Sequence, residues 1–219
     1  MKMLIAEIGV NWNTIMQFES MLLELGEMGV KYAKGQLFTE DYLDGRLKDQ
    51  VLTFDQAKSL MNMADDLGIT LFWTPSHDDT VDMVIELEPQ FIKIAHTHYN
   101  NENMAYKVNS SRIPIIVSEP ALTQDNLNFY WHRAKVLLCN NLYTPSPEAH
   151  RTFCWIRSYN GVSLHSPYIT PYIKSALDGL DIIEVHVKQN DDCIDSQVSL
   201  NMDEFRILKR ELDFIWGVE

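Results

Sequence analysis

The chain has 219 residues, of which 46% are hydrophobic and 22% charged, a composition typical of one globular domain. Its net charge of −13 argues against a general role on nucleic acid or anionic membranes, although a local basic pocket can still bind a small anion. No apolar run approaches the ~20 residues of a membrane span, and Glu7 interrupts the amino terminus too early for a signal peptide. Three widely spaced cysteines indicate a reducing compartment, so we expect a cytoplasmic protein.

Short apolar runs alternate with helical patterns, which is typical of a parallel sheet with crossover helices. No linker divides the chain, so we expect one domain over residues 1–219. The eight predicted strands lie at residues 4–9, 30–34, 70–74, 91–95, 114–118, 136–140, 161–165 and 181–186. Eight such strands favour a single-domain α/β fold, the (β/α)8 TIM barrel, with shortened loops because barrels typically need ~250 residues. An open sheet is less favoured, because no glycine-rich dinucleotide turn follows the first strand.

Capping signals support these boundaries. Residues 53–56 form a capping box before a helix that should end near Gly68. Residues 201–204 open the last helix in a similar way, and Ser146 precedes a proline at a first helical position. The crossover around residues 123–131 is short for a helix.

Polar residues recur on one face of several predicted strands. Alternation places Glu7, Gly9 and Asn11 on one face of the first strand. The same alternation groups further polar side chains on the other strands, namely Lys34 with Gln36, Lys93 alone, Ser163 with His165, and Glu184 with His186 and Lys188. Each could be a satisfied interior polar group or a solvated strand end. Barrel enzymes keep their catalytic residues at the carboxyl ends of the strands. The presence of several such polar residues at these ends therefore favours an active site there.

Residues 5–11, with the sequence IAEIGVN, resemble the opening motif of the sialic acid (N-acetylneuraminate) synthase family. These enzymes condense phosphoenolpyruvate with N-acetylmannosamine or related sugars. Further motifs similar to those of the family follow in order, at residues 34–36, 73–75, 91–95, 115–118, 138–143, 163–165, 184–186, 195 and 199–201. The resemblance covers the barrel domain over nearly the whole chain and implies a carbon–carbon bond-forming transferase of carbohydrate biosynthesis.

The resemblance also implies roles for individual residues. Phosphoenolpyruvate would be bound by Lys34, Thr74, Lys93, Ser118, Asn141 and Ser163, since ammonium, hydroxyl and amide donors suit a phosphate and a carboxylate. A divalent metal, Mn²⁺ or Mg²⁺, would be bound by His165 and His186. Catalysis would fall to Glu7, Tyr143 and Asp195, and sugar binding to Gln36, Tyr143 and Asp195. The expected product is a 2-keto-3-deoxy sugar acid, with release of phosphate.

Several positions depart from the family pattern. Leu164 replaces the aspartate of the family's Ser-Asp-His, a carboxylate that could orient a histidine. His98 lies near the position of a family glutamate, and Glu119, after the fifth strand, would repel a nearby phosphate. The chain ends after its last expected barrel helix, whereas family members continue into an antifreeze-like domain that helps close the sugar site. The missing domain would remove sugar contacts and a dimer contact, so we expect an acceptor other than N-acetylmannosamine itself. The expected partners are a second copy of the chain in a homodimer, or another protein that supplies the missing lid.

Two alternatives stay open beside the synthase. One is an aldolase or lyase that acts on a phosphorylated sugar. The other is a reduced barrel that binds a sugar or phosphorylated ligand, or needs a partner to complete its site.

Overall fold

The computed structural model describes residues 1–39, 50–120, 131, 133–140 and 159–218. Within these ranges eight parallel strands pair in chain order, and β1 also pairs with β8, which closes the sheet into a barrel. The strands are β1 (Met3–Gly9), β2 (Tyr32–Leu37), β3 (Thr70–Pro75), β4 (Ile92–Ile94), β5 (Ile115–Pro120), β6 (Lys135–Asn140), β7 (Gly161–Leu164) and β8 (Ile182–Lys188). The eight predicted strands and the TIM-barrel fold are therefore confirmed.

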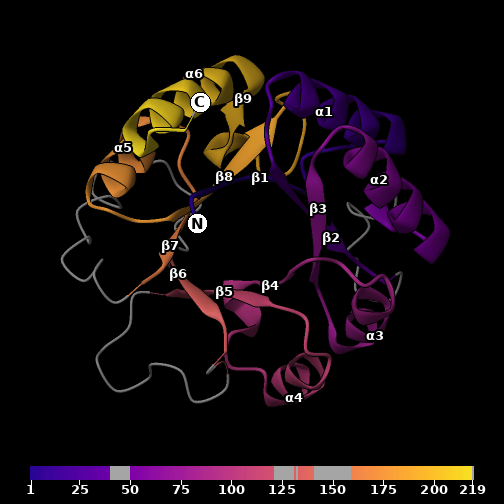
Figure 1. The fold of residues 1–219 in the computed structure, drawn as a ribbon. Helices are drawn as coiled ribbons and strands as arrows, with labels where there is room; N and C mark the ends of the chain where they lie inside the picture. The colour runs from indigo at the N-terminus through magenta and orange to yellow at the C-terminus, as the bar shows by residue number, and fades with distance from the viewer. Residues whose placement is uncertain (40–49, 121–130, 132, 141–158, 219) are drawn as a thin grey trace.

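Helices surround the barrel on its outside (Figure 1). In the described part of the chain they are α1 (Ile15–Glu27), α2 (Phe54–Asp66), α3 (Asp78–Glu86), α4 (Glu102–Ser110), α5 (Thr170–Leu177) and α6 (Met202–Trp216). A short strand, β9 (Leu200–Asn201), pairs with β8 just before α6. No described helix is long and apolar enough to cross a membrane.

The predicted helix starts at residues 53 and 201 are confirmed. The Thr53 side chain accepts from the Gln56 amide and the Gln56 side chain accepts from the Thr53 amide, which begins α2. Asn201 and Glu204 exchange the same bonds at the start of α6. Each reciprocal pair satisfies amides that the first helical turn leaves without intrahelical partners. The expected helix start at Ser146 and the crossover at residues 123–130 lie outside the described residues.

The barrel interior is divided into an apolar and a polar level. Seven buried side chains fill the amino-terminal half, and they are Met3, Ile5, Phe72, Phe91, Ile116, Leu137 and Ile182. Two residues further along the strands, on the same face, most inward positions become polar, as at Glu7, Thr74, Lys93, Ser118 and Glu184. The apolar level thus forms a floor beneath a polar space at the carboxyl ends.

Strand β1 departs from simple alternation near its end. Its register against β2 shifts between Glu7 and Gly9, and Gly9 has a φ of +41°. Asn11 therefore does not join Glu7 in the barrel mouth, as strict alternation predicts. It is fully buried and bonds instead to the Val187 carbonyl and to Ser199.

Candidate active site

A cavity of about 190 Å³ opens at the carboxyl ends of the strands, above the apolar floor. Its lining comes from strands far apart in the sequence, because barrel closure brings all eight strand ends to one mouth. The lining residues are Glu7, Lys34, Gln36, Lys93, Ala95, His96, Thr97, Ser118, Cys139, Ser163, His165, Glu184, His186 and Asp195.

Lys34, on β2, contacts charged and polar groups on both neighbouring strands. Its ammonium forms an ion pair with the Glu7 carboxylate of β1 and donates to Thr74 Oγ1 of β3 at 3.0 Å. The side chains of Lys34 and Glu7 are only 6% and 2% exposed. Burial lowers the pKa of Lys34 to about 7, an effect that the negative charges of Glu184 and Asp195 offset only in part.

Lys93, on β4, is the second buried cation of the cavity. Its ammonium donates to Ser118 Oγ at 2.7 Å and lies 3.3 Å from Glu184 Oε1. Ser163 Oγ donates to the same carboxylate oxygen at 2.8 Å. Burial raises the pKa of Glu184, but Lys93 and Lys34 outweigh it and keep that pKa below its usual value. Glu184 is therefore an ionised carboxylate inside the barrel.

Two imidazoles stand side by side at one wall of the cavity. The rings of His165 and His186 have centroids 4.7 Å apart, and His96 approaches His165 edge-on at 6.2 Å. Burial, together with His165, Lys34 and Lys93, lowers the pKa of His186 well below its usual value. Its imidazole is therefore neutral, the form that binds a metal ion.

Asp195 completes this wall from the loop that follows β8. Its Oδ2 lies 3.5 Å from His186 Nδ1. Burial raises the pKa of Asp195 to about 6. Nδ1 of His186 is buried and makes no hydrogen bond within the described part of the chain.

The donor set of this wall fits a divalent cation held through few protein ligands. Two neighbouring imidazoles and a polar cavity leave coordination positions for water or substrate oxygens. Among the described residues, no three histidine, cysteine, aspartate or glutamate side chains converge closely enough to hold a metal by themselves.

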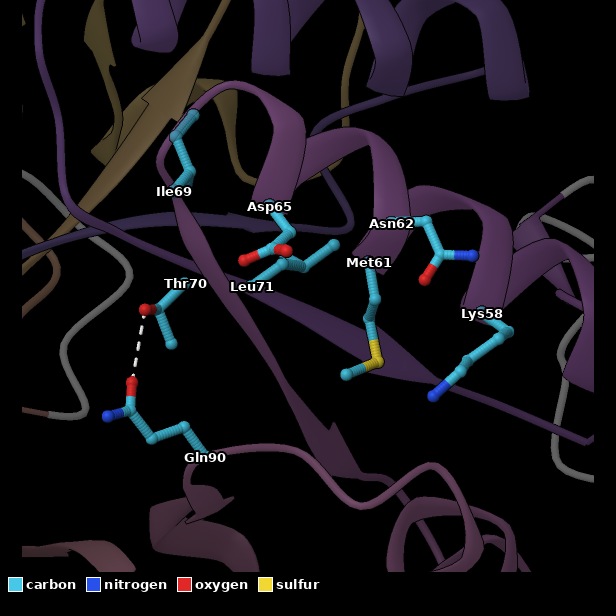
Figure 2. A pocket seen from close by; sticks show the side chains of 8 residues that line it. All are labelled: Lys58, Met61, Asn62, Asp65, Ile69, Thr70, Leu71 and Gln90. Carbon is cyan, nitrogen blue, oxygen red and sulfur yellow. Dashed lines mark hydrogen bonds between the residues drawn. The ribbon is translucent and has the colours of Figure 1, made fainter.

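A second hollow, of about 240 Å³, lies on the outside of the barrel between α2 and the start of β3 (Figure 2). Lys58, Asn62 and Asp65 reach it from α2 and are exposed. Thr70 Oγ1 donates to Gln90 Oε1 across its edge at 3.0 Å. Unlike the cavity in the barrel mouth, this hollow gathers no buried ionised groups. The barrel mouth is therefore the candidate active site.

A family model described as the NeuB family matches residues 27–217. The chain belongs to the NeuB family. No curated protein sequence matches it significantly.

Solved structures of similar fold agree with this membership. The chain resembles an N-acetylneuraminic acid (sialic acid) synthetase from Leptospira borgpetersenii serovar Hardjo-bovis, with a TM-score of 0.89 at 20% identity over 99% of this chain and 84% of that one. A spore coat polysaccharide biosynthesis protein E from Chromobacterium violaceum gives 0.85 at 18% identity over 99% and 75%. A truncated 3-deoxy-D-arabino-heptulosonate 7-phosphate synthase from Thermotoga maritima gives 0.68 at 18% over 100% and 88%. At these identities the likeness concerns the fold.

The structure gathers the site residues expected for this NeuB family barrel. Nine of them line the cavity, namely Glu7, Lys34, Gln36, Lys93, Ser118, Ser163, His165, His186 and Asp195. Thr74 lies just behind the lining and accepts from Lys34. Asn141 and Tyr143 lie outside the described residues. Their roles stay predictions, because position alone does not assign chemistry.

Four further polar residues of the cavity had no expected role. Glu184, Cys139, His96 and Thr97 all line it. Glu184 was within reach of sequence reasoning, because it stands two residues before His186 on the same face of one strand. His96 lies in a short 3₁₀ turn after β4, where no strand alternation applies. Burial raises the pKa of the Cys139 thiol to about 12, so it stays protonated.

Two departures from the family pattern have different consequences from those expected. Glu119 follows Ser118 on β5 and therefore faces the opposite side of the strand. It is buried but is not part of the cavity lining, so the expected repulsion of a bound phosphate stays a prediction that this position does not favour. Leu164 belongs to the apolar layer between strands and helices. The leucine at this position packs in the core. Its side chain does not line the cavity, so it does not stand in the place of a cavity carboxylate.

Proposed function

We propose that this NeuB family barrel is a metal-dependent synthase that condenses phosphoenolpyruvate with an aldose related to N-acetylmannosamine. The product would be a 2-keto-3-deoxy sugar acid of the sialic acid type. One observation carries the proposal, namely that two buried lysines from β2 and β4 share a single cavity with two adjacent imidazoles from β7 and β8. A ligand with a phosphate, a carboxylate and an oxygen that a metal could polarise would use both pairs.

In this proposal the lysine side of the cavity binds phosphoenolpyruvate. The ammonium groups of Lys34 and Lys93 would attract its phosphate and carboxylate, and the hydroxyls of Thr74, Ser118 and Ser163 would add hydrogen bonds. Asn141 is proposed as a further donor. Burial strengthens each of these interactions, because little water competes for the donors.

The histidine side would bind the cation, Mn²⁺ or Mg²⁺, through His165 and His186. When bound, such a cation supplies a Lewis acid for the aldehyde oxygen of the acceptor. Gln36, Tyr143 and Asp195 are proposed to hold the sugar hydroxyls and to orient its aldehyde towards the enolpyruvate.

The reaction forms one carbon–carbon bond and releases inorganic phosphate. C3 of the enolpyruvate bonds to the aldehyde carbon, whose oxygen becomes a hydroxyl. A water oxygen adds to C2 and becomes the keto oxygen as the C2–O bond to phosphate breaks, so one proton of the water ends on the new hydroxyl and the other on the phosphate. Glu7 is proposed to accept a proton of that water and to pass it to the new hydroxyl; its ion pair with Lys34, a proposed phosphate ligand, supports this role. Asp195 would help to orient the water.

The test measures inorganic phosphate after mixing the protein with phosphoenolpyruvate, Mn²⁺ and a panel of aldoses that includes N-acetylmannosamine. We expect release that depends on both the aldose and the metal, with a keto sugar acid of matching mass. The variant Lys93→Met should abolish it. Absence of turnover together with absence of calorimetric phosphoenolpyruvate binding would contradict the proposal.

A second candidate is a barrel that binds a phosphorylated ligand without turnover, or that turns over only with a partner. The observation in its favour is that both lysines already pair with carboxylates, Glu7 and Glu184, which reduces the positive charge available to an anion. Binding of phosphoenolpyruvate without phosphate release, or release only after a second polypeptide is added, would favour it.

A further inference from the structure

The loop that carries Asp195 is fastened to the end of β1 by buried hydrogen bonds. Asn11 Nδ2 donates to the Val187 carbonyl at 2.8 Å and to Ser199 Oγ at 2.9 Å, and Asn11 Oδ1 accepts from the Asp195 amide at 3.2 Å. Ser199 Oγ in turn donates to the Asp195 carbonyl at 2.7 Å. Asn11 and Ser199 are 0% and 1% exposed, so the bond between them is out of contact with water, while the two bonds to the Asp195 backbone are partly buried.

Lys188, on β8, holds the same loop at the residue that follows Asp195. Lys188 Nζ donates to the Ser196 carbonyl at 2.8 Å, one residue beyond Asp195. Strands β1 and β8 are neighbours in the closed barrel, so the two anchors share one rigid support. The Asp195 amide, the Asp195 carbonyl and the next carbonyl along the chain are therefore all hydrogen-bonded to fixed groups.

This held side chain faces His186. Asp195 Oδ2 lies 3.5 Å from Nδ1 of the ring, and that nitrogen is buried with no hydrogen bond inside the described ranges. A carboxylate facing one ring nitrogen favours the proton on that nitrogen and leaves the other nitrogen with a free lone pair. Contacts of this kind often lengthen in ligand-free sites and shorten when the ligand binds.

We propose that Asn11 and Ser199 are positioning residues, which hold the Asp195 carboxylate against Nδ1 of His186 so that Nε2 is the nitrogen free to bind a metal. The inference rests on the proposed function, in which His186 is a metal ligand, and it gives Asp195 a role towards that ligand as well as towards the sugar. In this proposal the carboxylate that orients the histidine comes from the loop after β8. Residue 164 cannot supply it, because in this chain it is a leucine of the outer apolar layer.

The first experiment reads the tautomer of His186 directly in the metal-free protein. Histidine labelled with ¹⁵N gives different long-range ¹H–¹⁵N patterns for the Nδ1–H and Nε2–H forms, and a His186→Gln variant identifies the signal. We expect the Nδ1–H form in the native protein above neutral pH. We expect the population to shift towards the Nε2–H form in Asp195→Asn and in Ser199→Ala.

The matched control is Ser196→Ala in the same loop. The bond that Ser196 makes to Lys188 uses its backbone carbonyl, which the substitution leaves in place. This variant should keep the native tautomer. Ser199→Ala and Asp195→Asn are preferred to changes at Asn11, because removing the fully buried amide leaves several polar groups unpaired and can prevent folding.

The second experiment measures Mn²⁺ affinity by electron paramagnetic resonance, without substrate or turnover. Loss of a group that orients a metal-bound histidine typically weakens affinity by about 10- to 100-fold. We expect weakening of about that size in Asp195→Asn, a smaller one in Ser199→Ala and none in Ser196→Ala.

The outcomes separate this inference from the function on which it rests. An Nε2–H tautomer in the native protein, or tautomers unchanged in both Asp195→Asn and Ser199→Ala, would overturn the positioning role whatever the activity. The expected tautomers without any Mn²⁺ binding by the native protein would support the positioning role and count against the proposed metal chemistry.

Discussion

Two lysine–carboxylate pairs stand inside a barrel whose floor is entirely apolar. Each pair is nearly inaccessible to water, and each is completed by at least one hydroxyl, Thr74 for Lys34 and Ser118 or Ser163 around Lys93 and Glu184. Burying such pairs costs desolvation free energy that their attraction only roughly repays. Their presence therefore points to ligand binding better than to stability.

Removing one partner of a pair should be more damaging than removing both. In Lys93→Met the Glu184 carboxylate stays buried without its cation, which should lower the free energy of unfolding by about 3–5 kcal/mol. The double variant Lys93→Met/Glu184→Gln should recover most of that loss while binding no phosphoenolpyruvate. Urea unfolding and calorimetry measure the two effects. Equal stability of the single and double variants would contradict the pairing.

Lys34 should make stability depend on pH above neutrality. Its pKa in the folded protein is lowered to about 7 from the usual 10.5, chiefly by burial. Between these values the unfolded chain binds more protons than the folded one, so the free energy of unfolding should rise with pH, by up to about 1.4 kcal/mol per pH unit.

Comparison with Lys34→Gln isolates this contribution. The stability of the native protein relative to the variant should increase between about pH 7 and pH 10, as urea unfolding at several pH values would show. The contributions of the other titrating groups cancel when the free energy of unfolding of the variant is subtracted from that of the native protein. If this difference does not change with pH, Glu7 keeps Lys34 charged throughout the range.

At the scale of elements, the end of β1 shows how a backbone feature aims a side chain. An ideal Cβ on Gly9 would lie 2.1 Å from Glu7 Oε1, and the φ of +41° is one that other residues rarely adopt. Glycine at this position therefore leaves room for the carboxylate that contacts Lys34. The accompanying register shift also sends Asn11 away from the cavity and towards Ser199.

Gly9→Ala should displace the Glu7 carboxylate and lower turnover by at least tenfold, while the fold survives. Gly29→Ala is the matched control, because Gly29 has a φ of +71° and an added Cβ would meet nothing within 4 Å. Both should lose about 1 kcal/mol of stability through backbone strain, but only the first should affect the reaction. Phosphate release and thermal unfolding of the two variants provide the comparison, and equal activities would be the contrary result.

At the scale of the whole molecule, closure of β1 onto β8 creates the site. It sets Glu7 opposite His186 in register, although 179 residues separate them along the chain. A ligand that binds this mouth interacts with strands from every part of the barrel. Such a ligand binds the folded state alone, and mass action then stabilises that state.

Phosphoenolpyruvate should therefore raise the melting temperature of the native protein. At a concentration about 100 times its Kd, the expected stabilisation is about 2.7 kcal/mol. Lys93→Met/Glu184→Gln should show no shift, since it keeps the fold but lacks one of the two ammonium groups proposed to bind the phosphate and carboxylate. Differential scanning fluorimetry measures both, and an equal shift in the two proteins would place the ligand elsewhere.

The sequence by itself determined the strands, the confirmed helix starts and the inward positions of Lys34, Lys93, His165 and His186. These depend on local alternation and capping, which nearby residues set. Only the tertiary structure decided that Glu184 pairs with Lys93 and that Asn11 holds the Asp195 loop. The physical reason is that a closed barrel joins strand ends across the whole chain, while one bulge at Gly9 reverses the alternation that a linear pattern assumes.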